Sequence, residues 1–388
     1  MSFPRVSLAS ITVSRHGGTP SKARPDYWEG NIPWVSPKDM RTQVIHDTTD
    51  HISEEAVSNS ATSVIPERSI LIVVRSGVLA HHVPIALTGR ALAFNQDLKA
   101  LIPDEARVIP DYIAYFLRAT EAQILEQGVK KGATVHSLRS GFIENLQMPL
   151  PPILEQRCII DILSRVEGIV RLQRQAAEKT RKIIPALFLD MFGDPATNPK
   201  GWPTSTFGSV GALDRGKSRH RPRDAKELYG GPYPFIQTGE IANSGGHMTR
   251  YNSTYSELGL AQSKSWPKGT LCITIAANIA KTAILDFDAC FPDSVVGFLP
   301  EDGIKTEYVQ AWLGFLQPTL EAIAPQAAQK NINLEILRKL PIPVPPTELQ
   351  EMFAEHVSDV QGILSQREKS QRGGAALFDA LLAQAFNA

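Results

Sequence analysis

Apolar residues recur at alternating steps of four and three positions through two long stretches of the chain. A period of about 3.5 residues is typical of a coiled-coil seam, in which one face of a helix packs against a second helix. The first stretch predicts a helix over residues 153–192 with a kink at Pro185, because proline removes a backbone hydrogen bond. Its apolar seam positions include Ile159, Leu163, Val166, Val170 and Ile184.

The second stretch predicts a helix over residues 347–387 with the same spacing. Both stretches turn polar in the middle, and we expect the two helices to pack on each other. Gly373 and Gly374 could interrupt the second helix, since a glycine costs about 1 kcal/mol relative to alanine inside a helix. The apolar seam positions of this stretch include Phe353, Val357, Val360, Leu364, Phe378 and Leu381.

Each long stretch begins with the same proline-rich segment. Residues 149–156 read PLPPILEQ, and residues 343–350, 194 positions further on, read PVPPTELQ. An internal repeat is stronger evidence about architecture than a single motif. The segments before the two helices also correspond in order, although each match is weak by itself. The corresponding pairs are residues 14–17 with 214–217, 33–40 with 234–241, 94–103 with 291–300, and 111–112 with 307–308.

The repeat predicts a chain built in the order domain, helix, domain, helix. In the first domain, residues 69–74 and 98–102 are predicted strands, 111–127 has helical spacing, and 132–138 is a predicted polar loop. Residues 198–203 are a predicted linker. We therefore predict an α+β fold: two duplicated mixed α/β domains separated by two long helices, which pack as an antiparallel coiled coil with approximate two-fold symmetry. The predicted parts are residues 1–148, 149–194, 195–342 and 343–388.

The composition is that of an ordinary globular chain of two or three domains, with 388 residues and a hydrophobic fraction of 43%. The apolar runs are too short to span a bilayer, and residues 1–6 lack the layout of a signal peptide. We therefore expect a cytoplasmic protein that does not contact a membrane. Cys158, Cys272 and Cys290 have no paired spacing, so neither a metal site nor a disulfide framework is expected.

Positive charge is concentrated in particular segments, although the chain as a whole is neutral. Lys and Arg total 40, and Asp and Glu also total 40. Nucleic-acid-binding domains are usually basic, so this balance by itself argues against a DNA partner. Residues 215–226, however, hold six basic residues against one acid, and residues 130–139 hold no acid. A polyanion would bind at such segments.

The side chains of these basic loops are candidate DNA contacts, because Arg and Lys neutralise phosphates and Arg, Lys, Asn and Gln read base edges. An ordinary solvated charge explains each residue equally well when it is taken singly, so the clusters carry more weight than their members. The candidates in the first domain are Arg15, Lys22, Arg24, Lys38, Arg75, Lys130, Lys131 and Arg139. The candidates in the second domain are Arg215, Lys217, Arg219, Arg221, Arg223, Lys281, Gln329, Lys330 and Asn331.

Motifs for enzymatic chemistry are incomplete in this sequence. Residues 211–218, GALDRGKS, match the phosphate-binding loop pattern, but that loop needs a buried strand before it and a helix after it. Residues 205–210 make a poor buried strand, and Pro222 would break a helix at its first turn. Neither a methyltransferase signature nor a nuclease carboxylate pair is recognisable. We therefore expect no catalytic residue, no cofactor and no metal ligand.

The chain resembles the specificity subunit of type I restriction–modification systems over essentially its whole length. This resemblance implies two target-recognition domains, each reading one half of a split DNA sequence, with the long helices acting as a ruler. It also implies that the helices dock methyltransferase (modification) subunits, two in our interpretation, which in turn support the restriction subunits. Specificity subunits of this kind have no active site of their own. The residues that carry the resemblance are 149–156, 341–350, 17–20 with 32–35, 229–236 and 192–195.

We therefore predict a non-catalytic DNA-recognition subunit, in which loops of both domains dock onto one double-stranded DNA. The seam residues of the two helices are then the candidate positions for helix packing and partner docking. Two other interpretations stay open at the level of sequence. One is a nucleotide-binding enzyme built on residues 211–218, and the other is a scaffold whose duplicated domains bind only proteins.

Overall fold

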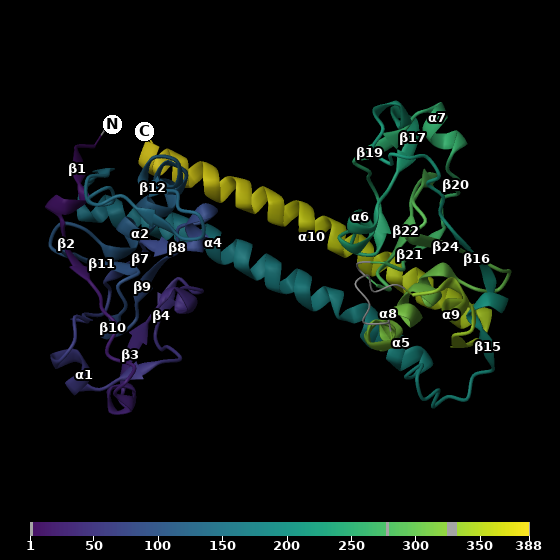
Figure 1. The fold of residues 1–388 in the computed structure, drawn as a ribbon, viewed down its shortest axis with the longest axis horizontal. Helices are drawn as coiled ribbons and strands as arrows, with labels where there is room; N and C mark the ends of the chain where they lie inside the picture. Colours follow the sequence, from purple (N-terminus) through teal and green to yellow (C-terminus); the bar gives the residue numbers. More distant parts are fainter. Residues whose placement is uncertain (1–2, 277–278, 324–331, 388) are drawn as a thin grey trace. The chain divides into compact units, whose positions relative to one another are not determined.

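The computed structural model describes residues 3–276, 279–323 and 332–387, and the chain divides into two compact units. The first unit contains Met1–Arg174 and Lys369–Ala388, and the second contains Gln175–Glu368. Each unit holds one mixed α/β domain together with parts of both long helices (Figure 1). The predicted order of domain, helix, domain, helix is therefore present.

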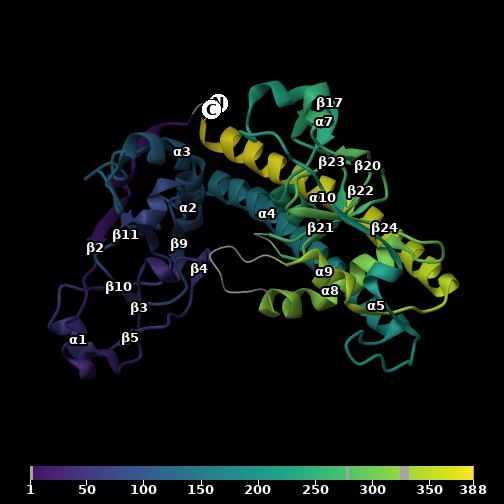
Figure 2. The same cartoon turned by 45° about the vertical axis from the view of Figure 1, so that its right-hand side comes forward.

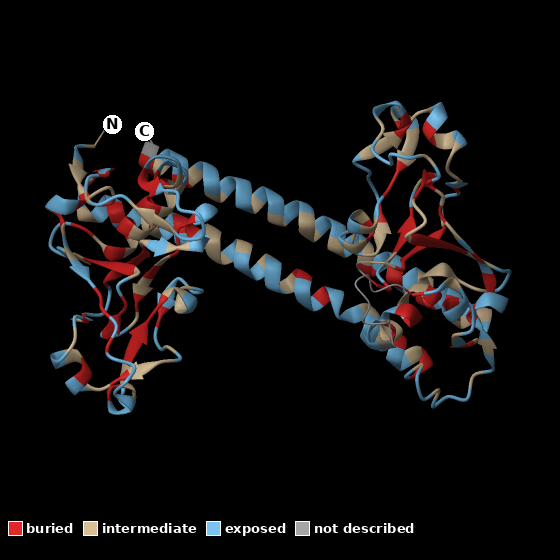
Figure 3. Ribbon diagram, in the orientation of Figure 1, coloured by how far each residue is buried: buried red, intermediate tan, exposed pale blue. Residues whose placement is uncertain are grey.

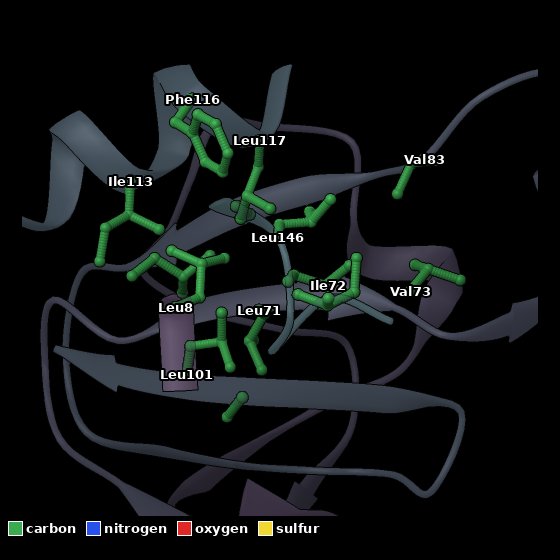
Figure 4. Close-up of a cluster of buried hydrophobic side chains, with 14 of the residues drawn as sticks. Leu8, Leu71, Ile72, Val73, Val83, Leu101, Ile113, Phe116, Leu117 and Leu146 are labelled. Carbon is green, nitrogen blue, oxygen red and sulfur yellow. The ribbon is translucent and has the colours of Figure 1, made fainter. Parts of the chain in front are cut away.

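The first domain is organised around a five-stranded sheet with the strand order β2-β11-β7-β9-β4. All its pairs are antiparallel except β4 with β9, which run parallel. The helix α2 lies beside this sheet, and its Ile113 and Phe116 belong to the same buried cluster as Leu71 and Leu101 (Figures 2 and 4). The bounds are β2 (Thr12–His16), β4 (Val44–Ile45), β7 (Ile70–Val73), β9 (Ile85–Thr88), β11 (Leu98–Pro103) and α2 (Pro110–Ala119).

A second, four-stranded sheet with the order β5-β3-β10-β6 forms another layer of the first domain, and β3 and β10 are parallel. The strand β1 pairs with β14 next to the first long helix. The bounds are β1 (Arg5–Ser7), β3 (Ile32–Val35), β5 (His51–Ile52), α1 (Glu54–Ser58), β6 (Val64–Ile65), β10 (Leu92–Phe94), α3 (Glu121–Gln123) and β14 (Gln147–Pro149).

A small three-stranded sheet completes the first domain, with the order β12-β13-β8. The predicted loop over residues 132–138 is wrong at its end, because β13 occupies His136–Leu138. This strand has only three residues and pairs both with the neighbouring β12 and with β8, which is distant in sequence. The other bounds are β8 (Arg75–Ser76) and β12 (Val129–Lys130).

The second domain repeats the five-, four- and two-stranded sheets of the first with equivalent strand orders. Its five-stranded sheet is β16-β24-β21-β22-β18, its four-stranded sheet is β19-β17-β23-β20, and β15 pairs with β25. The parallel pairs recur at equivalent places, as β18 with β22 and β17 with β23. The duplication predicted from the sequence is therefore confirmed.

The second domain is built from short strands joined by helices and loops, and its α8 occupies the place of α2 in the first domain. The strand bounds are β15 (Thr204–Thr206), β16 (Gly211–Arg215), β17 (Tyr229–Phe235), β18 (His247–Met248), β19 (Ser253–Tyr255), β20 (Ser265–Trp266), β21 (Leu271–Thr274), β22 (Thr282–Leu285), β23 (Ala289–Cys290), β24 (Val295–Pro300) and β25 (Pro341–Pro343). The helix bounds are α6 (Thr238–Ala242), α7 (Glu257–Ala261), α8 (Thr306–Ile323) and α9 (Leu334–Arg338).

The predicted match of residues 14–17 with 214–217 is wrong by one position. A Cβ added to Gly17 would lie 2.3 Å from the carbonyl oxygen of Phe94, and one added to Gly216 would lie 2.2 Å from that of Phe291. Only glycine lets the backbone approach so closely, so Gly17 corresponds to Gly216.

The long helices are α4 (Ile153–Arg181), α5 (Ile183–Phe192) and α10 (Thr347–Asn387). The predicted kink is present as a break at Lys182, one turn before Pro185, whose missing N–H cannot continue the helical hydrogen bonds. In contrast, α10 continues through Gly373 and Gly374. A Cβ at Gly374 would lie 3.1 Å from Cγ2 of Val170, so this glycine marks a close approach of the two helices.

The predicted linker after α5 is folded onto the end of that helix. Gly193 caps α5 with a positive φ of 81°, as its position before Pro195 predicts. Lys200 Nζ donates to the carbonyl oxygens of Asp190 and Met191 at 2.6 and 2.9 Å, which satisfies two carbonyl groups that a helix end leaves free. No helix among the described residues is long and apolar enough to cross a membrane.

Candidate DNA interface and helix surfaces

The three-stranded sheet of the first domain brings together basic residues that are far apart in the sequence. Lys130 on β12 is paired with Ser137 on β13, and Ser137 is paired with Arg75 on β8. Directly paired residues of antiparallel strands point to the same face, so these three side chains form one row. Arg139 follows β13 directly, and its N–H donates to the carbonyl oxygen of Gly128 at 2.8 Å. Arg75, Lys130, Lys131 and Arg139 are all exposed.

The other predicted contacts of the first domain lie apart from this row. Arg15 is exposed on β2, and Lys22 lies in an exposed turn. Arg24 is within 2.6 Å of Asp26 and 3.2 Å of Glu55, and the Asp26 carboxylate raises the pKa of Arg24. Lys38 forms an ion pair with Asp50 at 2.7 Å, which raises the pKa of Lys38. Arg24 and Lys38 are therefore partly neutralised.

The basic loop of the second domain follows β16 and is held by defined contacts. Gln262, at the end of α7, accepts hydrogen bonds from the N–H groups of Arg219 and His220 at 2.6 and 3.0 Å. Arg223 Nη2 donates to both carboxylate oxygens of Asp293, each at 3.0 Å. The loop is therefore fixed in place by residues whose role no motif in the sequence indicates.

The remaining cations of this loop differ in exposure. Arg219 and Arg221 are exposed, and Arg221 Nη1 donates to the carbonyl oxygens of Ser218 and His220. Arg215 and Lys217 are half-buried, and Lys281 is exposed next to β22. Gln329, Lys330 and Asn331 lie outside the described residues.

The start of each long helix is locked to its own domain by a buried glutamine. Gln156 Oε1 accepts a hydrogen bond from the N–H of Ile109 at 2.9 Å, and its Nε2 donates to the carbonyl oxygens of Arg107 and Pro151. Gln350 repeats this arrangement with the N–H of Lys305 at 3.0 Å and the carbonyl oxygen of Pro345. Both glutamines are 0% exposed.

A buried tyrosine completes each of these helix starts. Tyr112 donates to the carbonyl oxygen of Pro149 at 3.1 Å, and Tyr308 donates to that of Pro343 at 2.6 Å. Burial raises the pKa of both phenols above its ordinary value. The repeated proline-rich segment is therefore a joint between a domain and its helix.

Each domain also packs against the end of the other long helix. In the first unit, the end of α10 lies beside α2, where Phe386 contacts Tyr112 and Phe116 at ring-centroid distances of 5.0 and 5.7 Å (Figures 1 and 2). In the second unit, Phe188 of α5 stacks on Tyr308 at 5.5 Å. One helix therefore begins and the other ends within each unit, which makes their packing antiparallel.

The predicted seam residues are buried or half-buried, whereas most other positions of the long helices are exposed (Figure 3). Gln173 donates to the hydroxyl of Ser370 at 2.8 Å where the seams turn polar. Polar seam residues of this kind favour one register over others. The buried seam positions are Leu163, Phe353, Val357 and Val360, and the half-buried ones are Ile159, Val166, Val170, Ile184, Leu364, Phe378 and Leu381.

A second apolar stripe runs along the outer side of α4 and is exposed. Its members are separated by steps of four, seven and three residues, so they share one face of the helix. Leu154 is 75% exposed and Leu172 is 61% exposed, although both are large aliphatic side chains. Exposed aliphatic side chains that gather on one helix face make that face a candidate interaction site. The outer stripe consists of Leu154, Cys158, Ile162, Ile169 and Leu172.

Both halves of the chain match one known protein family. A sequence model described as the type I restriction modification DNA specificity domain matches residues 5–179 and again residues 199–371. The chain belongs to this family. Each match covers one mixed domain of this specificity-domain protein and most of the long helix that follows it.

The relatives of the specificity-domain protein include the Escherichia coli type I restriction enzyme EcoR124I/EcoR124II specificity subunit, which is 41% identical over 164 residues. This alignment covers 42% of the chain and 40% of the E. coli subunit, which is less than two thirds of that relative's length.

Two solved structures share the fold over nearly the whole chain. The S subunit of a type I restriction–modification system from M. genitalium has a TM-score of 0.60 with 14% identity, covering 100% of this chain and 96% of that one. A chain from a study of "complex assembly" and "conformational transition of the type I R-M system" has a TM-score of 0.62 with 18% identity, covering 99% and 97%.

The phosphate-binding loop interpretation of residues 211–218 is wrong for this specificity-domain protein. Residues 211–215 form the strand β16, and the described residues 216–225 that follow it form no helix. The N–H groups of Gly216 and Lys217 donate to the carbonyl oxygens of Val295 and Phe291 at 2.9 and 3.1 Å. Amides that already donate to backbone carbonyl groups cannot cradle a phosphate, which is what this loop requires. Among the described residues, no group of three or more His, Cys, Asp or Glu is placed to hold a metal ion.

Proposed function

We propose that this chain is the sequence-specific DNA-recognition subunit of a type I restriction–modification complex. The observation that carries the proposal is the double match to the specificity domain over two domains with the same sheet order. Each domain would recognise one half of a bipartite double-stranded DNA site. The subunit itself would be non-catalytic and would act where the DNA lies, in the cytoplasm.

The DNA side of the proposal rests on the exposed basic residues of both domains. The row on the three-stranded sheet supplies Arg75 and Lys130, and the loop after β16 supplies Arg219 and Arg221. Cations at such places neutralise phosphates and help to orient a protein on a duplex. A neutral chain can serve this role if partner subunits contribute further phosphate contacts.

The protein side of the proposal rests on the outer stripe of α4. An amphipathic face with i, i+4, i+7 anchors is a common way for a helix to bind a partner. We propose that methyltransferase subunits dock there and present their active site to the bound DNA. Two such subunits are proposed because the chain contains two domain–helix joints. The restriction subunits would join through the methyltransferase subunits.

The domain boundaries follow from the same proposal. We assign target recognition to residues 1–148 and 195–342, and spacing and docking to residues 149–194 and 343–388. The joints made by Gln156 and Gln350 support these boundaries, because they lie where each helix starts.

A mobility-shift assay with the methyltransferase partner tests the proposal. The full chain with its partner should retard a duplex that carries the methylated motif of the host genome, more strongly than a duplex with that motif scrambled. The chain alone should bind both duplexes less tightly. Binding of the partner without any DNA binding would instead support the protein-only scaffold.

A further inference from the structure

We propose that the three-stranded sheet β12-β13-β8 is a clamp for DNA backbone phosphates and does not read bases. The inference rests on the proposed DNA-recognition function and adds the kind of contact that this surface makes. It concerns the row Lys130, Ser137 and Arg75, with Lys131 and Arg139 beside it.

The two faces of this sheet have opposite character. The pair Val129 and Leu138 lies one residue away from the basic row and therefore points to the other face. Val129 is buried and Leu138 is partly buried against the hydrophobic core of the first domain. The basic row consequently sits on the solvent face of a sheet whose back is anchored in the core.

The cations of this surface are available to a polyanion. Among the described residues, no carboxylate lies within 4.0 Å of the amino or guanidinium groups of Lys130, Lys131 or Arg139, while Arg75 is 4.0 Å from Asp97. By comparison, Arg24 and Lys38 are held at 2.6 and 2.7 Å by carboxylates. A phosphate that binds to the row would therefore break few existing ion pairs.

The shape of the surface favours phosphates over base edges. The major groove is about 12 Å wide and admits a helix or a two-stranded ribbon. Three strands about 4.8 Å apart already span roughly 10 Å before their side chains are counted. Because the back of the sheet is packed on the core, these strands cannot enter a groove. The row lacks Asn and Gln, which read adenine, and its Arg and Lys would reach guanine only from within the groove, which these strands do not enter.

Neutralising the row should weaken DNA binding without changing sequence preference. We would compare Arg75→Gln/Lys130→Gln with the unmodified chain, each in complex with its methyltransferase partner, on a duplex with the recognised site and on one of random sequence. Affinity should fall by a similar factor for both duplexes. The slope of log K against log salt should become shallower by about 1 for each lost phosphate contact.

Arg68→Gln/Arg107→Gln is the matched control, because it removes the same charge from the same domain at residues held by Asp111 and by the carbonyl oxygen of Ser10. It should leave the salt slope nearly unchanged, and Arg75→Lys/Lys130→Arg should keep the original slope. An unchanged slope in the Arg75→Gln/Lys130→Gln variant, or a loss confined to the specific duplex, would overturn the phosphate clamp alone. If the unmodified complex bound neither duplex, both the phosphate clamp and the proposed DNA-recognition function would be contradicted.

Discussion

The most informative residues are the two glutamines at the helix starts, because they explain why the proline-rich segment occurs twice. Gln156 and Gln350 satisfy backbone groups that would otherwise be buried without partners. The prolines before them have no N–H to donate in a backbone hydrogen bond, so the side-chain amide of each glutamine supplies a donor in this segment. A residue that looks polar and ordinary in sequence thus becomes the fixed point between domain and helix.

Replacing Gln156 by Leu should destabilise the protein by about 2–4 kcal/mol, since buried groups left unpaired cost about 1–3 kcal/mol each. Gln350→Leu should have a similar effect through the N–H of Lys305. Cys158→Ala, at an exposed position of the same helix, should change stability by less than about 0.5 kcal/mol. Urea unfolding measures the stability of all three variants. Equal stabilities for Gln156→Leu and Cys158→Ala would contradict the role of Gln156 in holding the helix start to its domain.

Gln262 holds the basic loop of the second domain through two backbone hydrogen bonds. In Gln262→Leu the N–H groups of Arg219 and His220 lose their acceptor, so both amides should exchange with deuterium faster. The amides of Gly216 and Lys217 donate to the carbonyl oxygens of Val295 and Phe291 and should keep their protection. Hydrogen exchange followed by mass spectrometry would measure this, and unchanged protection of residues 219–220 would show that another contact holds the loop.

At the scale of elements, the long helices differ in how they tolerate unfavourable residues. The break at Lys182 accommodates Pro185, whereas α10 remains continuous through two glycines. The reason lies in packing: Gly374 faces Val170 and Gln173 of α4, while no described atom outside its own stretch of helix lies within 4 Å of a Cβ at Gly373. Gly374 is therefore needed for the close approach of α4 and α10, and Gly373 has no such role.

Gly373→Ala should therefore stabilise the protein by about 1 kcal/mol, the difference in helix propensity. Gly374→Leu should destabilise it by about 1–3 kcal/mol, because the side chain would have to push α4 and α10 apart. Thermal or urea unfolding separates the two variants. Unchanged or increased stability in Gly374→Leu would mean that the helices do not approach closely at this glycine.

The contact of α4 with the first domain should depend on pH through Glu167. Burial alone would raise the pKa of Glu167, but Arg118, at 2.6 Å, together with Gln43 and Tyr115 outweighs it, so the pKa lies below its ordinary value. A carboxyl whose pKa is lower in the folded state stabilises the protein above its unfolded pKa of about 4.3. That stability is lost as pH falls through the folded pKa.

Glu167→Gln should remove this part of the acid sensitivity. Its unfolding free energy should be lower than that of the unmodified chain at pH 7, with a smaller difference between pH 7 and pH 3. Urea unfolding at both pH values measures the effect, and identical pH dependence in the two proteins would contradict the role of Glu167.

The helices and the duplication could be predicted because they leave long, regular patterns in the sequence. The seam spacing extends over many turns, and the repeated helix starts fix the register of the comparison. The strand β13 was missed because it has only three residues and, besides the neighbouring β12, pairs with β8, which lies far away in the chain. For the same reason, the row that joins Arg75 to Lys130 became visible only in the fold, although both residues stood among the candidates.

At the scale of the whole molecule, duplication gives one chain two similar domains whose surfaces carry different chemistry. Basic residues gather on the three-stranded sheet in the first domain and on the loop after β16 in the second. Two related domains with different surfaces suit a protein that recognises two unlike half-sites. We therefore expect exchange of the second domain for that of another family member to change one half-site only.

The central claim is that two recognition domains read a split site whose gap is set by the long helices. Its most direct test is sequencing of methylated bases in DNA modified by the complete complex, with one heptad inserted in α4 after Arg174 and one in α10 before Lys369. Seven helical residues add about 10.5 Å, which is about three base pairs at about 3.4 Å each. The methylated motif should keep both half-sites, and the gap between them should be longer by about three base pairs. Unchanged spacing in an active complex, or a single contiguous motif, would contradict it.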